Sequence, residues 1–224
     1  MERVDVRQNV LKENDRIAAE LRADFERRGI LCLNVIASPG AGKTSLLEHT
    51  LQAFSGGRHR VAVLTGDIQT ERDAARLARF GFPARQITTG GTCHLDATMV
   101  KRALADVSLD GLDLLFIENV GNLVCPAAYD LGEAAKVVML SVAEGDDKPM
   151  KYPSIFSRAA LMLLHKVDLL PYTRFDVAAA KADARRVNPG IEIIETSCVG
   201  APGLQGWFDW VERVASSAAC RKAR

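Results

Sequence analysis

The feature that most constrains this chain is a short glycine-containing turn between an apolar run and a helix. The run Leu31–Ala37 is short and mainly apolar, as expected of a buried strand. The turn Ser38–Gly42 follows, and Lys43–Phe54 then places its leucines and its phenylalanine on one helical face. A strand, a tight turn and a helix in this order predict one unit of an α/β sheet.

The same alternation of strand and helix continues along the chain. The first thirty residues predict a helix, because apolar residues from Val6 to Phe25 recur at spacings of four or seven. Strands alternating with helices predict a mainly parallel α/β sheet of about seven strands with helices on both faces. In such sheets ligands bind beyond the carboxyl ends of the strands. Further strands are expected at 60–64, 84–88, 112–117, 136–142, 161–165 and 191–195, and further helices at 70–80, 94–105, 175–186 and 204–214.

The turn after the first strand has the pattern of a phosphate-binding loop. Ala37-Ser38-Pro39-Gly40-Ala41-Gly42-Lys43-Thr44 matches that pattern except at its first position, where alanine replaces glycine. The glycines let backbone N–H groups face a phosphate, and the helix N-terminus adds partial positive charge. Lys43 can reach the β- and γ-phosphates, and Thr44 can ligate magnesium. The alternative is an ordinary strand–turn–helix. The predicted phosphate contacts are Ser38, Pro39, Gly40, Ala41, Gly42, Lys43, Thr44 and Ser45.

A later strand exit carries residues that suit recognition of a base. The run Leu164-His165-Lys166-Val167-Asp168 resembles the Asn-Lys-x-Asp signature of GTPases, in which the Asp carboxylate accepts two hydrogen bonds from guanine. Lys166 would pack along the base, whereas His165 stands where Asn is usual and could still donate one hydrogen bond. Ser197 and Cys198 follow the last strand and resemble the second base-contacting loop. A charged strand exit without a base is the alternative.

Two carboxylates are expected where central strands end. Asp67 and Glu118 would both point at the phosphates, where a carboxylate can hold magnesium or orient the attacking water. The spacing from Glu118 to Gly121 resembles a γ-phosphate sensor, in which a glycine N–H contacts the phosphate and is released after hydrolysis. Solvated loop acids are the alternative. We therefore predict Lys43, Asp67, Glu118 and Gly121 as the catalytic group, with Thr44, Asp67 and Glu118 for magnesium.

Cysteine and histidine residues follow two other strands. Cys93 and His94 come after the third strand, and Cys125 lies seven residues past Glu118. Two thiolates and an imidazole suit zinc or nickel. Spacing alone favours the alternative of two buried cysteines and a surface histidine. Three protein ligands would also leave a site incomplete unless a second subunit contributes.

Composition limits the partners and the compartment. Lys and Arg number 29 and Asp and Glu number 28, so the net charge of +1 argues against a nucleic acid or an acidic membrane as partner. We expect no membrane span, since no apolar run approaches the roughly 18 residues required. Five cysteines in 224 residues make a disulfide framework improbable, so we expect a reduced, cytoplasmic protein.

Together these residues resemble the family of GTPases that insert nickel into hydrogenases, the HypB family. The likeness covers essentially the whole chain, with a helix at 1–30, a GTPase domain at 31–216 and a polar basic tail at 217–224. Two runs are specific to that family and are absent from other phosphate-loop proteins. The likeness is carried by the phosphate loop, Thr65-Gly66-Asp67-Ile68-Gln69-Thr70, Cys93-His94, Glu118-Asn119-Val120-Gly121-Asn122-Leu123-Val124-Cys125-Pro126 and Glu144-Gly145-Asp146-Asp147-Lys148-Pro149, the last two being the specific ones.

The resemblance implies a function and a set of ligands. It implies a magnesium-dependent GTPase, slow in converting GTP to GDP and phosphate, that couples nucleotide state to nickel delivery for a nickel–iron hydrogenase. It assigns Cys93, His94 and Cys125 to a nickel or zinc site at the interface of a GTP-promoted homodimer. Its implied partners are a small zinc- or nickel-binding maturation protein (HypA-like) and the precursor of the hydrogenase large subunit.

The chain departs from that family in its N-terminal region, and this limits the nickel-binding function that we predict. Neither an N-terminal Cys-x-x-Cys-Gly-Cys motif nor a histidine-rich tract is present, since the first cysteine is Cys32 and the first histidine is His49. High-affinity nickel storage is therefore not expected. The alternatives are a urease-type nickel GTPase, a phosphate-loop kinase of small molecules, and a metal-binding module whose nucleotide site is only structural.

Overall fold

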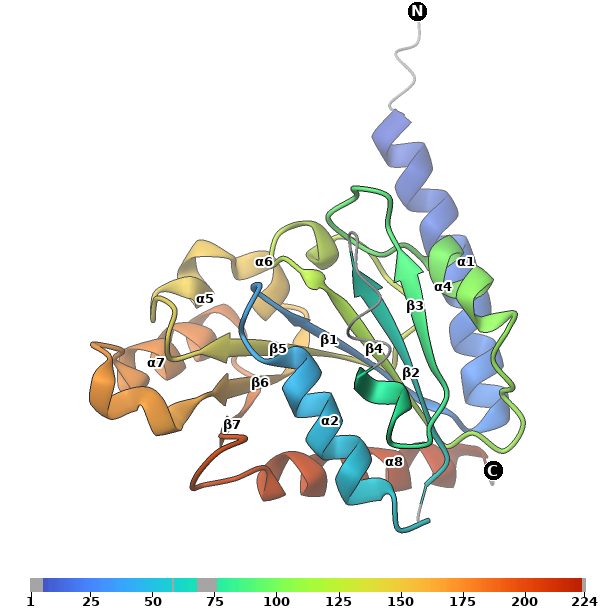
Figure 1. The fold of residues 1–224 in the computed structure, drawn as a ribbon. Coiled ribbons are helices and arrows are strands. Elements are labelled where there is room, and N and C mark those ends of the chain that lie inside the picture. The colour runs from blue at the N-terminus through green and yellow to red at the C-terminus, as the bar shows by residue number, and fades with distance from the viewer. Residues whose placement is uncertain (1–5, 58, 68–75, 223–224) are drawn as a thin grey trace, which may run out of the picture.

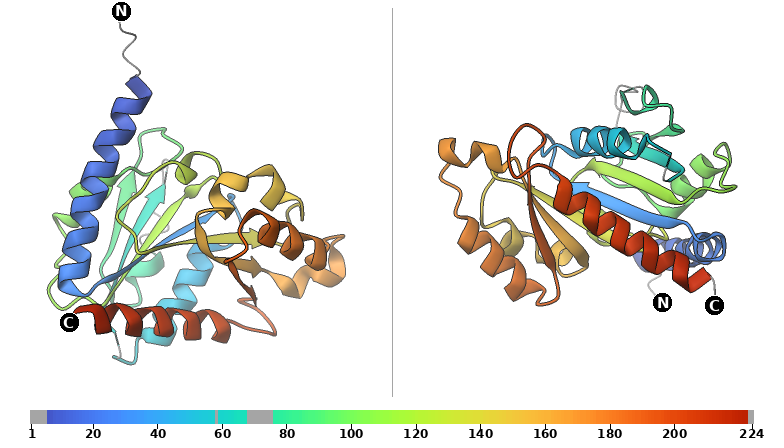
Figure 2. Two further views of the ribbon diagram at one scale, coloured as in Figure 1. Left: turned by 180° about the vertical axis from the view of Figure 1, so that it is seen from behind. Right: turned by 90° about the horizontal axis from the view of Figure 1, so that it is seen from below.

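A computed structural model describes residues 6–57, 59–67 and 76–222. They form seven strands in one fully parallel sheet, in the order β3-β2-β4-β1-β5-β6-β7, with helices on both faces (Figures 1 and 2). This confirms the predicted α/β class. The strands are β1 (Leu31–Ala37), β2 (Val61–Asp67), β3 (Ala84–Thr88), β4 (Leu114–Gly121), β5 (Ala135–Ser141), β6 (Ala159–His165) and β7 (Glu192–Thr196).

The helices divide the core between the two sides of the sheet. One cluster packs α2 and α8 against alternate residues of the central strands, while two others pack α1 with α4, and α6 with α7, against the opposite face. No helix among the described residues is long and apolar enough to span a bilayer. The helices are α1 (Val6–Arg28), α2 (Lys43–Phe54), α4 (Ala97–Leu104), α5 (Lys148–Lys151), α6 (Pro153–Phe156), α7 (Val177–Val187) and α8 (Gln205–Lys222), with 3₁₀ turns η1 (Cys125–Ala127) and η2 (Val167–Tyr172).

Two central strands run further than their apolar residues suggest. Strand β2 continues to Asp67 and β4 to Gly121, so Glu118 lies inside a strand rather than after it. Glu118 is flanked by Val35 of β1 and Thr65 of β2. Because β1 and β2 pair with β4 on its two sides, its backbone stays in the sheet at Glu118. A charged side chain at this position therefore does not end the strand.

Two predicted helix boundaries also differ. Helix α4 begins at Ala97 and not at His94, because Asp96 caps it by accepting a hydrogen bond from the Met99 N–H at 2.7 Å. Helix α8 extends past Val214, so residues 217–222 are helical and not a separate tail. The helix predicted over 70–80 falls largely on 68–75, which lie outside the described residues.

The N-terminal helix departs from its predicted apolar stripe at two points. Ile17, Leu21 and Phe25 are buried, but Val10 is 51% exposed. Asn14, between Val10 and Ile17, is buried instead. Figure 1 shows the first turns of α1 extending beyond the sheet.

Candidate nucleotide site and metal cluster

The phosphate loop joins β1 to α2 at the carboxyl end of the sheet. Gly40 and Gly42 have φ values of 74° and 109°, which favour glycine. Ala37, which replaces the first glycine of the pattern, keeps its place in β1 opposite Met139 and has no positive φ. Lys43 opens α2 and is only 8% exposed. The alanine is therefore accommodated without strain.

A cavity of about 680 Å³ lies beside this loop. It brings together groups predicted from five separate parts of the sequence. Ser38, Ala41 and Ser197 were also predicted as contacts, but they do not line it. Of the predicted residues, its walls include Pro39, Gly40, Gly42, Lys43, Thr44, Ser45, Asp67, Glu118, Gly121, Lys166, Asp168 and Cys198.

Oxygen ligands gather at the phosphate end of the cavity. The Thr44 hydroxyl donates a hydrogen bond to Glu118 Oε1 at 2.7 Å, and Glu118 is 4% exposed. Asp67 lines the same wall. Carboxylate and hydroxyl oxygens are the donors that Mg²⁺ prefers, so these three residues fit a magnesium ion beside bound phosphates.

Gly121 packs directly against the phosphate loop. A Cβ built on Gly121 would lie 2.9 Å from Pro39 Cα, closer than real contacts allow. The end of β4 and the loop backbone are therefore in contact without a side chain between them. A shift of the phosphate loop would therefore displace Gly121, which lies four residues before Cys125.

The two base-recognition segments meet at the other end of the cavity. Lys166 has a left-handed backbone with φ 61°, and its Nζ donates to the Gly40 carbonyl at 2.7 Å. The Ser197 hydroxyl donates to Asp168 Oδ1 at 2.5 Å and accepts the N–H of Val199 and of Gly200. Ser197, which does not line the cavity, thus orients the Asp168 carboxylate, which does.

His165 occupies a buried position between the loops. Its Nδ1 lies 2.9 Å from Thr196 Oγ1, and its Nε2 lies 3.6 Å from Cys198 Sγ. A Cβ on Gly42 would meet the imidazole at 2.9 Å. Burial, with the nearby Lys166 charge, lowers the pKa of His165 to about 4, so the ring is neutral near pH 7. We expected this ring to face a base: it lines the cavity, and both its nitrogens have partners within the chain.

Three further residues at this end of the sheet carry no predicted role. Arg76 and Asn119 line the cavity, and the Arg76 guanidinium binds both oxygens of Glu48 on α2, at 3.1 and 2.6 Å. Lys148, within the run Glu144–Pro149, donates to Ser38 Oγ at 3.3 Å. Arg76 lies within a predicted helix, and no motif around it in the sequence indicates that it lines a cavity.

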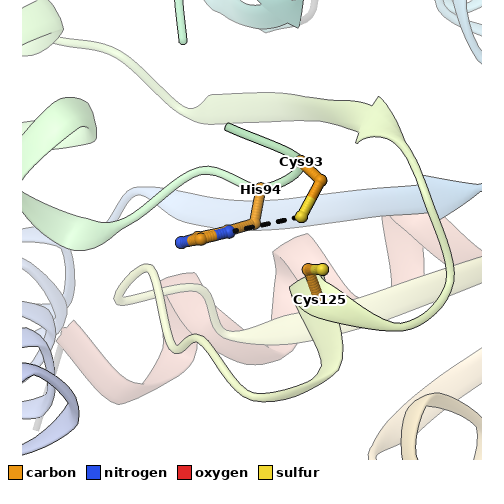
Figure 3. Close-up of side chains that lie close together, drawn as sticks. All are labelled: Cys93, His94 and Cys125. Atoms are coloured by element: carbon orange, nitrogen blue, oxygen red, sulfur yellow. Dashed lines mark hydrogen bonds between the residues drawn. The ribbon is translucent and has the colours of Figure 1, made fainter. Parts of the chain in front are cut away.

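Cys93, His94 and Cys125, which follow β3 and β4, form one cluster. Their ligand atoms all lie within 4.8 Å of one another, and Cys93 Sγ is 3.9 Å from His94 Nδ1 (Figure 3). The sheet order explains the meeting, because β3 and β4 flank β2 and their following loops converge. The alternative of two buried cysteines is wrong, since Cys93 is exposed and Cys125 partly so.

The surroundings of the cluster favour the uncharged forms of Cys125 and His94. A hydrogen bond with Cys93, together with partial burial, raises the pKa of the Cys125 thiol. Burial lowers the pKa of His94, which favours the neutral imidazole that ligates metals. The His94 ring stacks on Tyr129, with centroids 3.8 Å apart and an interplanar angle of 20°. Metal binding here must release thiol protons.

A central strand that ends in a glycine loop and feeds a helix, beside a cavity walled by carboxylates, defines a phosphate-loop nucleotide-binding protein. Residues 32–195 match the family described as "CobW/HypB/UreG, nucleotide-binding domain". The chain belongs to the CobW/HypB/UreG family.

Within that family the chain is similar to hydrogenase maturation factors HypB. It is 57% identical over 210 residues to the Azotobacter vinelandii protein, covering 93% of this chain and 68% of that one. The crystal structure of HypB from Archaeoglobus fulgidus superposes with a TM-score of 0.85 at 40% identity, over 91% of this chain and 99% of that one. HypB from Helicobacter pylori in complex with nickel gives the same TM-score and identity, over 92% and 96%.

Proposed function

We propose that this chain is a magnesium-dependent GTPase that couples its nucleotide state to nickel delivery during maturation of a nickel–iron hydrogenase. The observation that carries the proposal is the junction at Gly121. On one side Gly121 abuts Pro39 of the phosphate loop, and four residues on Cys125 joins Cys93 and His94. The names of the similar HypB proteins, and the nickel in one of their structures, support the metal and the pathway.

Hydrolysis of GTP to GDP and phosphate would take place at the phosphate end of the cavity. Lys43 and the loop N–H groups stabilise the charge that develops on the transferring phosphoryl group. Thr44, Asp67 and Glu118 would hold Mg²⁺, which neutralises phosphate charge when bound. Asp67 or Glu118 orients the attacking water. The Arg76 guanidinium binds Glu48, and the slow turnover we propose fits an arginine held by that ion pair.

Guanine selectivity rests on Asp168. The hydrogen bond from Ser197 holds that carboxylate toward the cavity, where it accepts two hydrogen bonds from guanine and none from adenine. Lys166, fixed on the Gly40 carbonyl, lies along the base. A kinase of small molecules would have no need of this pair, so comparison of GTP with ATP hydrolysis separates the two functions.

Coupling runs from Glu118 and Gly121 to Cys125. Contact of the Gly121 N–H with a γ-phosphate holds the loop, and its loss after hydrolysis moves a thiolate ligand. Binding linkage is reciprocal, so nickel must change GTP affinity by the factor by which GTP changes nickel affinity. A typical coupling is about 1–3 kcal/mol, or roughly 5- to 150-fold.

Assembly completes the metal site. Three protein ligands leave a coordination position open, and the same residues of a second copy would close it in a GTP-promoted homodimer. A small metal-binding maturation protein and the hydrogenase precursor are the proposed partners, supported by the maturation role in the relatives' names. We place this exchange in the cytoplasm, where thiols stay reduced.

The test combines hydrolysis with nickel titration on one preparation. We expect GTP to be hydrolysed in preference to ATP, and nickel affinity to differ between the GDP form and the form with a non-hydrolysable GTP analogue. Cys125→Ser should weaken nickel binding, whereas Cys32→Ala, which removes a fully buried thiol outside the cluster, should not. Equal nickel affinity in both nucleotide forms and in Cys125→Ser would remove the metal site and the switch.

A further inference from the structure

Asn14 is a polar side chain on the apolar face of α1, and it is only 4% exposed. Burying an amide is costly unless its polar atoms are paired. Here Nδ2 donates to the Asp130 carbonyl at 2.9 Å, and Oδ1 accepts the Ala97 N–H at 2.8 Å. Asn14 therefore joins two backbone segments that are distant from it and from each other in the sequence.

Both of those segments hold His94. Ala97 begins α4 three residues after His94, so its N–H fixes the end of the segment that carries the imidazole. Asp130 directly follows Tyr129, whose ring stacks on the imidazole at 3.8 Å. A single side chain thus sets the separation between the histidine and the ring that packs against it.

Arg22 strengthens one of these attachments. It lies two turns after Asn14 on α1, and its Nη2 binds both oxygens of Asp130 at 2.6 and 2.7 Å. Its described bonds reach only the segment around Asp130 and Glu133. Asn14 is therefore the residue of α1 whose described bonds connect that segment with α4.

The thiolate ligands are held by a different asparagine. Asn122 Nδ2 donates to the Cys93 carbonyl at 3.2 Å, while its Oδ1 accepts the Val124 N–H at 2.9 Å. Asn122 follows Gly121 and so belongs to the nucleotide side of the protein. The segments that carry the cysteines are therefore held by Asn122, and those beside the histidine by Asn14.

We propose that Asn14 is the positioning residue for His94 and that α1 thereby sets the nickel affinity of the cluster. The proposal rests on the proposed function, because it requires the cluster to bind nickel. Residues that orient a metal ligand from outside its coordination sphere typically contribute 10- to 100-fold to metal affinity. Loss of Asn14 should therefore cost about that factor while leaving the two thiolates in place.

The experiment titrates nickel sulfate into the full chain and follows the thiolate-to-nickel absorption. Asn14→Leu removes both hydrogen bonds at nearly constant volume, and Asn14→Asp keeps only the acceptor for Ala97. The matched control is Asn9→Leu, on the same helix but exposed. We expect a roughly 10- to 100-fold loss for Asn14→Leu, a smaller loss for Asn14→Asp and no change for Asn9→Leu.

A His94→Ala background separates positioning from general destabilisation. If Asn14 acts through His94, Asn14→Leu should cause no further loss of nickel affinity in that background. Equal losses with and without His94, or unchanged affinity in Asn14→Leu and Asn14→Asp, would overturn the inference while the proposed function stands. Failure of the unaltered protein to bind nickel would overturn both.

Discussion

The phosphate end of the nucleotide cavity and the cysteine–histidine cluster are built in different ways. The charged groups at the phosphate end come from strands and the first turn of a helix, and Lys43 and Glu118 are almost fully buried. The cluster ligands come from a loop and from the 3₁₀ turn η1, and none of them is buried. Backbone pairing fixes the first site, whereas side-chain bonds from Asn14 and Asn122 hold the second.

The difference indicates where each site can respond. A site fixed by a sheet is rigid and suits chemistry that needs preorganised charge. A site built on loops and a short turn can change its geometry at a small cost in free energy. Gly121 contacts the phosphate loop and lies four residues before Cys125. Substitutions can therefore be divided into those that change nucleotide binding alone and those that also change metal binding.

The largest expected effect is that of Lys43→Ala. Losing a charged group that stabilises the transition state typically costs about 10²–10³ in rate. We expect GTP hydrolysis to fall by at least that factor, measured by phosphate release, while nickel affinity without nucleotide stays unchanged. Lys101→Ala, at an exposed ion pair with Glu20, is the control. Full activity in Lys43→Ala would remove the phosphate loop from the chemistry.

His165 should make the free energy of unfolding depend on pH. Its pKa is lowered from 6.5 to about 4 in the folded protein, chiefly by burial. The unfolded chain therefore binds a proton that the folded chain does not between these values, and stability falls as the pH drops through that window. The loss attributable to His165 reaches about 3 kcal/mol at its lower end.

The measurement is urea unfolding at several pH values between 7 and 4. His165→Asn should flatten the pH dependence by about 3 kcal/mol relative to the unaltered chain. His49→Asn, which replaces an exposed histidine, is the control. Identical slopes in the unaltered chain and His165→Asn would show that this imidazole is not held neutral by the fold.

Asp168→Asn tests the base end of the cavity. Asn can still accept the Ser197 hydroxyl, so the loop should keep its shape, but the charged acceptor for guanine is lost. Hydrogen bonds to charged groups contribute about 1.5–3 kcal/mol, so GTP affinity should fall roughly 10- to 150-fold by calorimetry. Asp110→Asn, at a side chain 91% exposed, is the control. Unaltered GTP affinity would mean that Asp168 does not recognise the base.

Gly121→Ala should affect both the nucleotide site and the metal cluster. Its methyl group would enter the space held by Pro39, and overpacking of this kind costs about 1–3 kcal/mol. We expect weaker GTP binding and a smaller difference in nickel affinity between the GDP and GTP-analogue forms. Gly56→Ala, whose Cβ would meet nothing within 4 Å, should change neither. A weakened nucleotide site with undiminished coupling would separate Gly121 from the metal.

Much of this protein follows from local sequence. The phosphate loop could be located because its chemistry needs glycines and a lysine at fixed spacing, and the structure places Gly40, Gly42 and Lys43 accordingly. The alternation of apolar runs with amphipathic helices predicted a mainly parallel sheet of about seven strands, and the structure has seven. These signals are readable because each depends on residues that are neighbours along the chain.

The metal cluster and its supports depended on tertiary structure. Spacing could not bring Cys93 to Cys125, because their separation is decided by the order of β3, β2 and β4 in the sheet. Asn14 left one faint signal, a polar residue at an apolar position of a helix. Its partners are the N–H of Ala97 and the carbonyl of Asp130, and such backbone groups are the same whatever the side chain. A sequence records side chains, so bonds to a distant backbone become visible only once the chain is folded.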